Sequence, residues 1–512
     1  MEATKEHETK KDRDGAGKPL VEWIFCLVVS AALLAVCSRS SPFYPINYWV
    51  DANCFFTVGK SMMNGLVTYR DIYEQKGPLL YFLHGLAYLI SNDGFLGVYL
   101  IETLAFASFL LSMVRIMKLY TARVPYLLPA VLGALIATSN SFVVGDSAEE
   151  ICLPFISWSL YYMLKLLRET KSSENTGFSL PVVMLNGILA GCVLWIKFNL
   201  LGFHLGWIIV LCILTLRKGG LIQALKTGTV FLLGMLAATL PWITYFGIHY
   251  ALGDLWMAYF HNNIFLYSVP SASVLAGLKN SISNFLVGLY HNPGHTLPVA
   301  VGMLWTLFCP RKYLSVSAKA GIYATFALLA AGVYVGGRAY AYYALIFSAY
   351  AVLGCLPVLR LIGAAASRIK HSPARATRTL LSVMGLVLCI VFAYRNANDT
   401  FQFGTGKSAT VQYRFSEIMH QFDDNPTLLN YGFLDGGFYT AANIVPNCKY
   451  FCILNIPLQE MWDSQDEYLR SGKVEFVVTR DKVLDTNQFE KYEFVSSDSF
   501  YSSSYFLYRL ST

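Results

Sequence analysis

Residues 180–216 read LPVVMLNGILAGCVLWIKFNLLGFHLGWIIVLCILTL, a stretch in which Lys197 is the only charged side chain. A helix needs about 20 residues to cross the hydrocarbon core of a bilayer, so this stretch has room for two passages. Apolar runs of comparable length recur along the first three quarters of the chain. Because only helices and closed barrels satisfy their backbone inside lipid, these runs predict an α-helical, polytopic membrane protein.

The composition agrees with a membrane fold and argues against a soluble one. Hydrophobic residues make up 55% of the chain, charged residues 14%, and the mean hydropathy is +0.46. A soluble domain carries roughly 25% charge. The net charge of +7 does not indicate nucleic-acid binding, because Lys and Arg fall in short clusters between apolar runs rather than in one stripe. The eleven cysteines show no zinc-site spacing and are typical of small core residues.

The apolar runs predict about eleven transmembrane helices within residues 20–394, after a cytoplasmic, disordered tail at 1–19. These spans are 20–37, 94–114, 124–141, 150–167, 180–196, 199–216, 228–248, 296–309, 320–335, 342–363 and 379–394. A cytoplasmic start puts all five basic clusters on the inner side, as the positive-inside rule requires. The clusters are Arg115, Lys118 and Arg123; Lys165, Arg168 and Lys171; Arg217, Lys218 and Lys226; Arg311, Lys312 and Lys319; and Arg368, Lys370, Arg375 and Arg378.

This topology depends on Pro78–Ile90, an apolar run of about 13 residues. If it crossed the membrane, every later basic cluster would move outside unless the N-terminus were outside too. Runs of this length more often mark an interfacial segment, so we expect a helix at the outer surface. The outer regions are then the loop 39–93, the loop 251–295 and residues 395–512. The last of these contains strand-like stretches, KVEFVVTR and SSSYFLYRL, and predicts a small extracytoplasmic α/β domain.

The first outer loop carries candidate residues for chemistry. Asp51 follows the first span, and a mixed cluster of Arg70, Asp71, Glu74 and Lys76 precedes Gly77-Pro78. Such a cluster can offer a general base and a phosphate partner at a membrane surface. The alternative is an interfacial loop whose charges only face water.

A second acidic cluster, Asp146, Glu149 and Glu150, opens the fourth predicted span on the same side as Asp51. These carboxylates could act as helix caps, as a general base, or as ligands of a divalent cation such as Mg²⁺ or Mn²⁺. The sequence does not decide between these roles and requires no cofactor.

Three cations are candidates for binding a lipid phosphate at the outer interface: Lys76, Lys197 and Arg338. Lys197 interrupts an apolar run, where an ionisable side chain is a functional hypothesis by default; the alternative is a lysine that snorkels from the helix end. Arg338 is followed by Tyr342 and Tyr343, which could line the same site or form an aromatic interface belt.

The order of these motifs resembles a known family. Asp51, GKSMMNGLVTYRDIYEQKGPLLYF, GDSAEEICLPF, IKFN and GGRAYAYY are together similar to bacterial GT-C glycosyltransferases related to the protein O-mannosyltransferases and the lipid A aminoarabinose transferase, glycosyltransferase family 39-like proteins. The likeness covers about Val21 to Leu345, and LNYGFLDGGFYTAANIVPNCKYF is similar to the outer domain of some members.

The resemblance implies inverting transfer of a sugar from a polyprenyl-phosphate carrier to an extracytoplasmic acceptor, which could be a cell-envelope glycan, a lipid or a protein. By position, Asp51 would be the catalytic base, Glu149 or Glu150 the acid that positions acceptor or metal, and Lys76 a phosphate ligand. Two departures weaken the match. The family's Lys-Pro-Pro is Lys76-Gly77-Pro78 here, and its frequent second acid after the first Asp is Ala52.

Two other classes of function compete with the enzyme. A lipid-linked glycan flippase or another transporter is expected to show matching halves and mid-membrane charges, and neither pattern is present here. A non-catalytic sensor would leave the clustered outer acids without a role. We therefore predict a glycosyltransferase that crosses the plasma membrane several times, with a cytoplasmic N-terminus and the C-terminal domain outside.

Overall fold

The computed structural model describes residues 19–121, 124–172, 178–366 and 375–511. The chain divides into two compact units, and each is described by itself. The first comprises Met1–Cys37, Glu102–Ala238 and Ser273–Asp399; the second comprises Ser38–Ile101, Thr239–Ala272 and Thr400–Thr512. The tail 1–18 and the basic residues Arg123, Arg368 and Lys370 lie outside the described residues.

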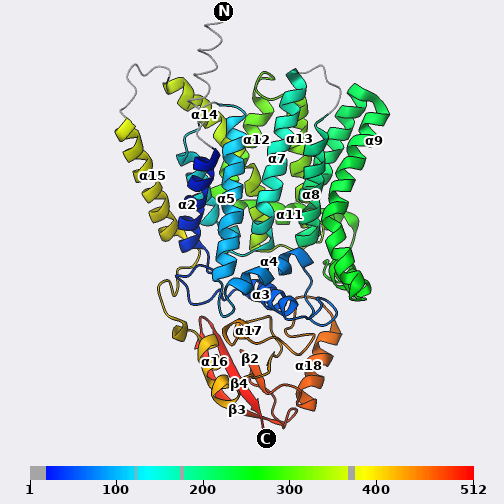
Figure 1. Ribbon diagram of the computed structural model, residues 1–512, viewed down its shortest axis with the longest axis vertical. Helices are drawn as coiled ribbons and strands as arrows, with labels where there is room; N and C mark the ends of the chain where they lie inside the picture. Colours follow the sequence, from blue (N-terminus) through cyan, green and yellow to red (C-terminus); the bar gives the residue numbers. More distant parts are fainter. Residues whose placement is uncertain (1–18, 122–123, 173–177, 367–374, 512) are drawn as a thin grey trace, which may run out of the picture. The chain divides into compact units, whose positions relative to one another are not determined.

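The first unit is helical (Figure 1), and a helix lies at each of the predicted spans. Its longer helices, including most of α5 and α9, are α2 Pro19–Cys37, α5 Leu96–Lys118, α6 Leu127–Ala137, α7 Ala148–Ser172, α8 Leu180–Lys197, α9 Gly202–Ile248, α11 Val274–Tyr290, α12 Pro293–Phe308, α13 Val316–Tyr334, α14 Val352–Ala366 and α15 Arg375–Asn396. Short 3₁₀ helices lie at η1 Asn140–Phe142, η2 Phe198–Leu201 and η4 Ala341–Tyr350. Helix α9 is kinked at Gly220, whose φ of 78° separates two predicted spans.

Six helical stretches among the described residues are long and apolar enough to cross a membrane. They are Pro19–Cys37, Leu96–Lys118, Leu180–Ile248, Val316–Tyr334, Ala341–Ala365 and Thr379–Asn396. On α15 the side chains of Leu380 and Leu388 are 60% and 65% exposed, an arrangement that suits lipid rather than water. The chain is therefore a multi-pass membrane protein, as predicted, while the number of eleven passages stays a prediction.

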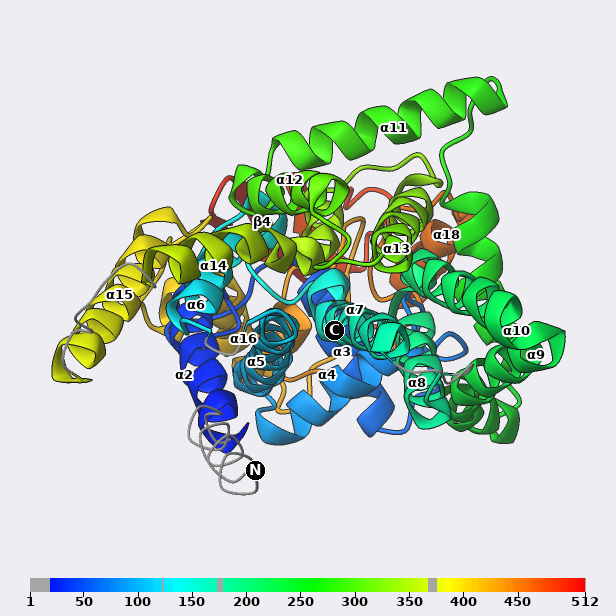
Figure 2. The same ribbon diagram turned by 90° about the horizontal axis from the view of Figure 1, so that it is seen from above.

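Small residues let the helices of the first unit approach closely. A Cβ atom added to Gly187 of α8 would lie 2.1 Å from the carbonyl oxygen of Phe231 in α9. One added to Gly302 of α12 would lie 2.6 Å from the amide nitrogen of Gly354 in α14, and Figure 2 shows these two helices side by side. Close packing of backbones at small residues is the usual way in which membrane helices associate.

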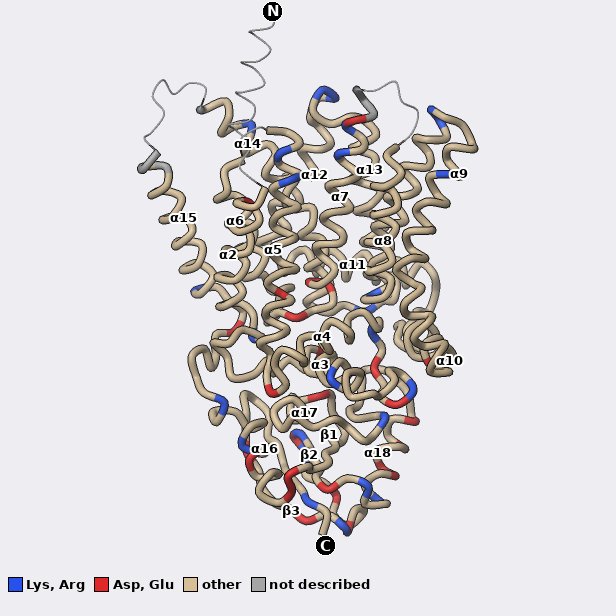
Figure 3. Tube along the Cα trace, viewed as in Figure 1, with Lys and Arg blue, Asp and Glu red and all other residues tan. Residues whose placement is uncertain are grey.

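Basic residues gather at one end of the helices of the first unit, near the labels of α9, α12 and α13 in Figure 3. Arg115 and Lys118 in the last turn of α5 form ion pairs with Glu22 of α2, with Arg115 at 3.2 Å. Predicted clusters from separate turns thus share one end of the unit, which is the pattern that the positive-inside rule describes.

The second unit joins three segments that contain parts of all the predicted outer regions. Its helices are α3 Val50–Met63, α4 Pro78–Ile90, α10 Leu252–Leu255, the π-helix η3 Trp256–Leu266, η5 Lys407–Ala409, α16 Val411–Phe422, α17 Phe438–Ala441 and α18 Gln459–Ser471. The apolar run Pro78–Ile90 is helix α4, which packs on α3: a Cβ on Gly59 would lie 2.5 Å from the amide nitrogen of Gly85.

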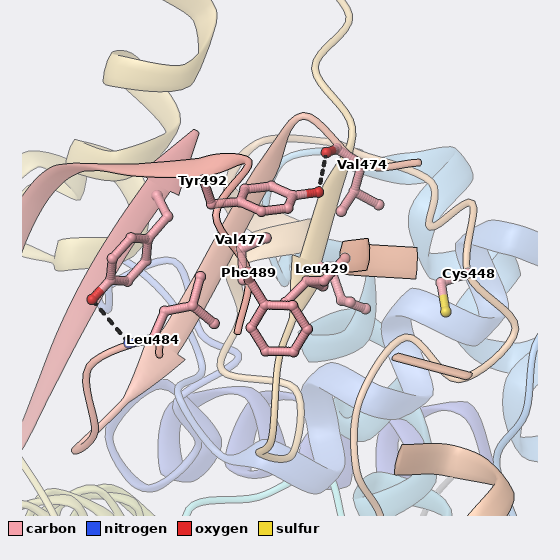
Figure 4. Packing of buried hydrophobic residues seen from close by; sticks show 9 residues of the cluster. Leu429, Cys448, Val474, Val477, Leu484, Phe489 and Tyr492 are labelled. Carbon is pink, nitrogen blue, oxygen red and sulfur yellow. Dashed lines mark hydrogen bonds between the residues drawn. The ribbon is translucent and has the colours of Figure 1, made fainter. Parts of the chain in front are cut away.

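A four-stranded sheet completes the second unit, in the order β1-β2-β4-β3. Strand β1 (Leu428–Asn430) is parallel to β2 (Phe476–Arg480), and β4 (Ser503–Leu510) runs antiparallel to both β2 and β3 (Tyr492–Phe500). Leu429, Val477, Phe489 and Tyr492 meet in its core, shown in Figure 4, where the Tyr492 hydroxyl donates to the Val474 carbonyl at 2.8 Å. The prediction of a small C-terminal α/β region, with strands at KVEFVVTR and SSSYFLYRL, is confirmed.

Candidate functional site

A buried ion pair lies inside the first unit. Lys197, the last residue of α8, donates from Nζ to Oε1 of Glu149 at 2.5 Å, and Glu149 lies in the first turn of α7. Lys197 is 8% exposed and Glu149 is fully buried. Taking two charges out of water costs several kcal/mol per ion before their attraction is counted, so such a pair needs a reason. The structure brings together two residues that the sequence offered separately.

Aromatic rings border the ammonium of Lys197. Its Nζ lies 4.2 Å from the ring centroid of Tyr343 and 5.1 Å from that of Tyr342, both at the start of η4. A cation over a tyrosine face is stabilised by about 0.5–2 kcal/mol, more when desolvated. Arg338, in the turn before η4, donates to the Tyr340 hydroxyl at 3.3 Å. The predicted cations Lys197 and Arg338 and the predicted tyrosines therefore belong to one neighbourhood, at one end of η4.

The acidic cluster at the start of α7 is joined by hydrogen bonds to the helix N-terminus and to a further carboxylate in α5. Ser147 caps the helix, because its Oγ accepts from the amide of Glu150 at 3.0 Å. The amide of Asp146 in turn donates to Glu150 Oε2 at 2.9 Å and to Glu102 Oε1 at 2.8 Å. Sequence reasoning missed Glu102, although a lone carboxylate inside the apolar helix α5 is itself a signal for a functional residue.

The turn that leads into this cluster is strained. Val143 adopts φ 55° and ψ −105°, and Asp146 has a φ of 65°. A β-branched residue with positive φ is a genuine outlier, and strain of about 1–3 kcal/mol persists only where neighbouring structure enforces it. The side chain of Asn398 enforces it here, since its amide donates to the Ser139 and Val143 carbonyls at 2.8 and 2.7 Å.

Two buried oxygens of the cluster, Glu149 Oε2 and Glu150 Oε1, have no hydrogen-bond donor among the described residues. A buried acceptor without a partner costs about 1–3 kcal/mol, so the cluster retains capacity for a polar ligand. Within the described ranges, no group of three or more His, Cys, Asp or Glu side chains is arranged to hold a metal ion. The described residues therefore provide no set of ligands for the divalent cation that the sequence predicts at Asp146 and Glu149.

Asp51 and Lys76 belong to the second unit. Asp51 is partly exposed in the first turn of α3, and its carboxylate has no hydrogen-bond or ion-pair partner among the described residues.

The Lys76 ammonium lies 3.8 Å from Glu74 Oε1 and 5.6 Å from the ring centroid of Phe55. The Lys76 backbone is held on both sides, because its amide donates to the Tyr81 hydroxyl at 2.7 Å and its carbonyl accepts from a second tyrosine.

A polar face of α3, which the sequence did not reveal, docks on residues 435–440. The Thr57 hydroxyl donates to Asp435 Oδ2 at 2.6 Å, and Lys60 Nζ donates to the Tyr439 carbonyl at 2.7 Å. Lys60 and Asp435 are fully buried. Burial lowers the pKa of Lys60 from its ordinary 10.5 to about 7, and the charge of Asp435 opposes that shift.

The low pKa of Lys60 predicts how stability depends on pH. The folded state binds fewer protons than the unfolded state between pH 7 and pH 10.5, so the free energy of unfolding rises with pH across this window. We expect the thermal unfolding midpoint to increase from pH 7 to pH 9.5, and Lys60→Met to flatten that slope. The exposed Lys482→Met is the matched control and should keep the slope. Equal slopes in all three proteins would contradict the assignment.

The fold is shared with solved structures. No protein-family model matches the sequence, and no curated protein matches it. The chain is similar to ArnT from Cupriavidus metallidurans bound to undecaprenyl phosphate, with a TM-score of 0.58, 14% identity, and coverage of 94% of this chain and 97% of that chain. The apo state of the same ArnT gives a TM-score of 0.52 at 12% identity, with the same coverage.

An oligosaccharyltransferase from Archaeoglobus fulgidus, in complex with zinc and sulfate, gives a TM-score of 0.46 at 12% identity, covering 89% of this chain and 67% of that chain. The similarity to ArnT shows that the fold of this protein is that of the GT-C glycosyltransferases, and it confirms the resemblance to the lipid A aminoarabinose transferase at the level of fold.

Proposed function

We propose that this protein is an inverting glycosyltransferase that moves a sugar from a polyprenyl-phosphate carrier to an acceptor outside the cytoplasm. The observation that carries the proposal is the buried Lys197 ammonium between Glu149 and Tyr343, in a fold that ArnT uses with undecaprenyl phosphate bound. A buried cation beside aromatic rings suits a phosphate that is attached to an apolar chain. The phosphate needs a charged partner, whereas the apolar chain does not.

The reaction exchanges one bond at the anomeric carbon. The acceptor oxygen attacks this carbon as the bond to the carrier phosphate breaks, and the phosphate leaves with the bonding electrons. The proton of the acceptor hydroxyl passes to Asp51, whose carboxylate has no ion pair among the described residues. A single displacement inverts the anomeric configuration. The leaving phosphate needs less acid assistance than an alcohol would, so the absence of an acid beside Asp51 is compatible with this step.

The cations stabilise the charge that develops on the leaving phosphate. Glu149 and Tyr343 hold the Lys197 ammonium in position, so its charge need not reorganise during the reaction. Lys76 and Arg338 are the further phosphate ligands in this proposal. Glu149 and Glu150 contribute buried acceptor oxygens that can bind a hydroxyl of the sugar or acceptor. No step requires a divalent cation, and an assay with and without a chelator tests this.

The assay uses the purified protein in lipid nanodiscs with synthetic polyprenyl-phosphate hexose, pentose and amino-sugar donors. Release of polyprenyl phosphate together with a glycosylated acceptor of inverted configuration is the expected result. Movement of intact donor between leaflets of a vesicle, without release of polyprenyl phosphate from any donor, would instead identify a transporter and overturn the proposal.

The proposal requires the C-terminal region to face outward, which labelling can test. Ser502 is exposed in the turn between β3 and β4, and Lys312 is exposed in a turn predicted to be cytoplasmic. All native cysteines are buried or partly buried, so their background reactivity is low. A membrane-impermeant maleimide should label Ser502→Cys in intact cells and Lys312→Cys only after permeabilisation. The reverse result would contradict the orientation.

A further inference from the structure

Two cysteines that are 398 positions apart in the sequence face each other in the second unit. The Sγ atoms of Cys54, on α3, and Cys452, after α17, are 3.8 Å apart. Their side chains are almost inaccessible, with exposures of 1% and 2%. The two thiols are free in the structure, and a disulfide has an S–S distance of about 2.05 Å, so the sulfurs need to approach by about 1.8 Å for the bond to form.

Polar contacts on both sides of the thiols fix the segments that carry them. Asn53, beside Cys54, accepts from the Thr440 hydroxyl at 3.2 Å, and Thr57 donates to Asp435 at 2.6 Å. The Tyr439 hydroxyl donates to the carbonyl of Phe451, the neighbour of Cys452, at 2.8 Å. These contacts hold the two segments in place, so the two sulfurs face each other because of the surrounding packing.

We infer that Cys54 and Cys452 form a disulfide that ties helix α3 to the C-terminal segment. The inference rests on the outward placement of this unit in the proposed function, because disulfides persist in oxidising compartments. Each thiol gives up a proton, the pair gives up two electrons, and one S–S bond forms. The oxidant is the disulfide of a thiol oxidoreductase, which forms a mixed disulfide with one cysteine and leaves as a dithiol when the other attacks.

Burial protects the bond once it has formed. The thiolate is the reactive form in exchange, and burial raises the pKa of both thiols above 9.0. The folded unit therefore shields the finished bond from reductants. Cys54 lies one turn after Asp51 on α3, so the bond also anchors the helix that carries the proposed base.

Cys448 provides the matched control. It lies four residues before Cys452 but belongs to the core of the sheet, shown in Figure 4. Its Sγ lies 3.6 Å from the Tyr450 carbonyl and 4.0 Å from the Ser464 hydroxyl. A general tendency of buried cysteines to oxidise would affect Cys448 as well, whereas the geometry selects Cys54 and Cys452.

The experiment maps the bond in the full-length protein. Membranes are denatured in the presence of N-ethylmaleimide without reductant, digested and analysed by mass spectrometry. We expect a peptide pair linked through Cys54 and Cys452 that is lost after dithiothreitol treatment or in Cys54→Ser, and is retained in Cys448→Ser. N-ethylmaleimide on both Cys54 and Cys452 of the wild-type protein would overturn the inference.

The sugar-transfer assay on the same preparation separates this inference from the proposed function. In one outcome, the protein transfers sugar although both Cys54 and Cys452 carry N-ethylmaleimide after denaturation. That result would contradict the disulfide and support the proposed enzyme activity. A linked peptide in protein that transfers no sugar would uphold the disulfide and count against the enzyme.

Discussion

Replacing Asp51 by Asn should lower the rate of sugar transfer by about 10²–10⁴-fold, the usual contribution of a general base. The amide keeps the size and hydrogen-bonding capacity of the carboxylate but cannot accept the acceptor's proton. Stability should change little, because Asp51 is partly exposed and its carboxylate has no partner among the described residues. The measurement is kcat with a fixed polyprenyl-phosphate donor in nanodiscs, together with donor binding and the thermal unfolding midpoint.

The same carboxylate-to-amide change at Asp93 is the control. Asp93 belongs to the same unit and forms an exposed ion pair with Lys407, and exposed pairs contribute about 0–1 kcal/mol. Asp93→Asn should therefore keep nearly full activity. If Asp51→Asn also kept it, the base would have to be sought among Asp71, Glu74, Asp146, Glu149 and Glu150, and the role taken from the family resemblance would be wrong.

Periodicity and residue type were sufficient to predict the membrane class and most of the helices. A long, predominantly apolar run has one stable form in lipid, so α2, α5 and α8 follow from local sequence alone. The strand-like stretches near Val477 and Leu507 likewise contain enough apolar and β-branched residues to predict β2 and β4. Helix α11 was missed, because it lies in a predicted loop whose asparagines and serines weaken the apolar pattern.

The site was predictable only in part, since sequence shows which charges are unusual but not which partner each one finds. Lys197 stood out as a lone charge, yet its partner Glu149 was equally consistent with a helix cap. The docking of Thr57 and Lys60 on residues 435–440 was not recognised, because both segments have ordinary mixed polarity and lie far apart in the sequence. Contacts of this kind arise from tertiary packing, which cannot be seen in a single sequence.

The second large effect is expected at Lys197. Lys197→Met retains the apolar stem but leaves the buried Glu149 carboxylate without its ammonium, so we expect destabilisation of roughly 3–5 kcal/mol. Any loss of activity in this variant would mix instability with loss of phosphate binding. The double variant Lys197→Met/Glu149→Gln removes both charges and should recover most of the lost stability, because no unpaired buried charge remains.

The double variant separates a structural counter-ion from a phosphate ligand. If Lys197 binds the carrier phosphate, the double variant should still show a kcat/KM for the donor that is reduced on the order of 10- to 100-fold. This reduction corresponds to the loss of a hydrogen bond to a charged group, which contributes about 1.5–3 kcal/mol. Glu149→Gln alone, which keeps the ammonium beside Tyr343, should retain more activity than the double variant. The four proteins form a double-mutant cycle in which thermal midpoint and kcat/KM are measured together. A double variant that regained both stability and wild-type kcat/KM would show that Lys197 serves only to neutralise Glu149, and the phosphate would need another partner.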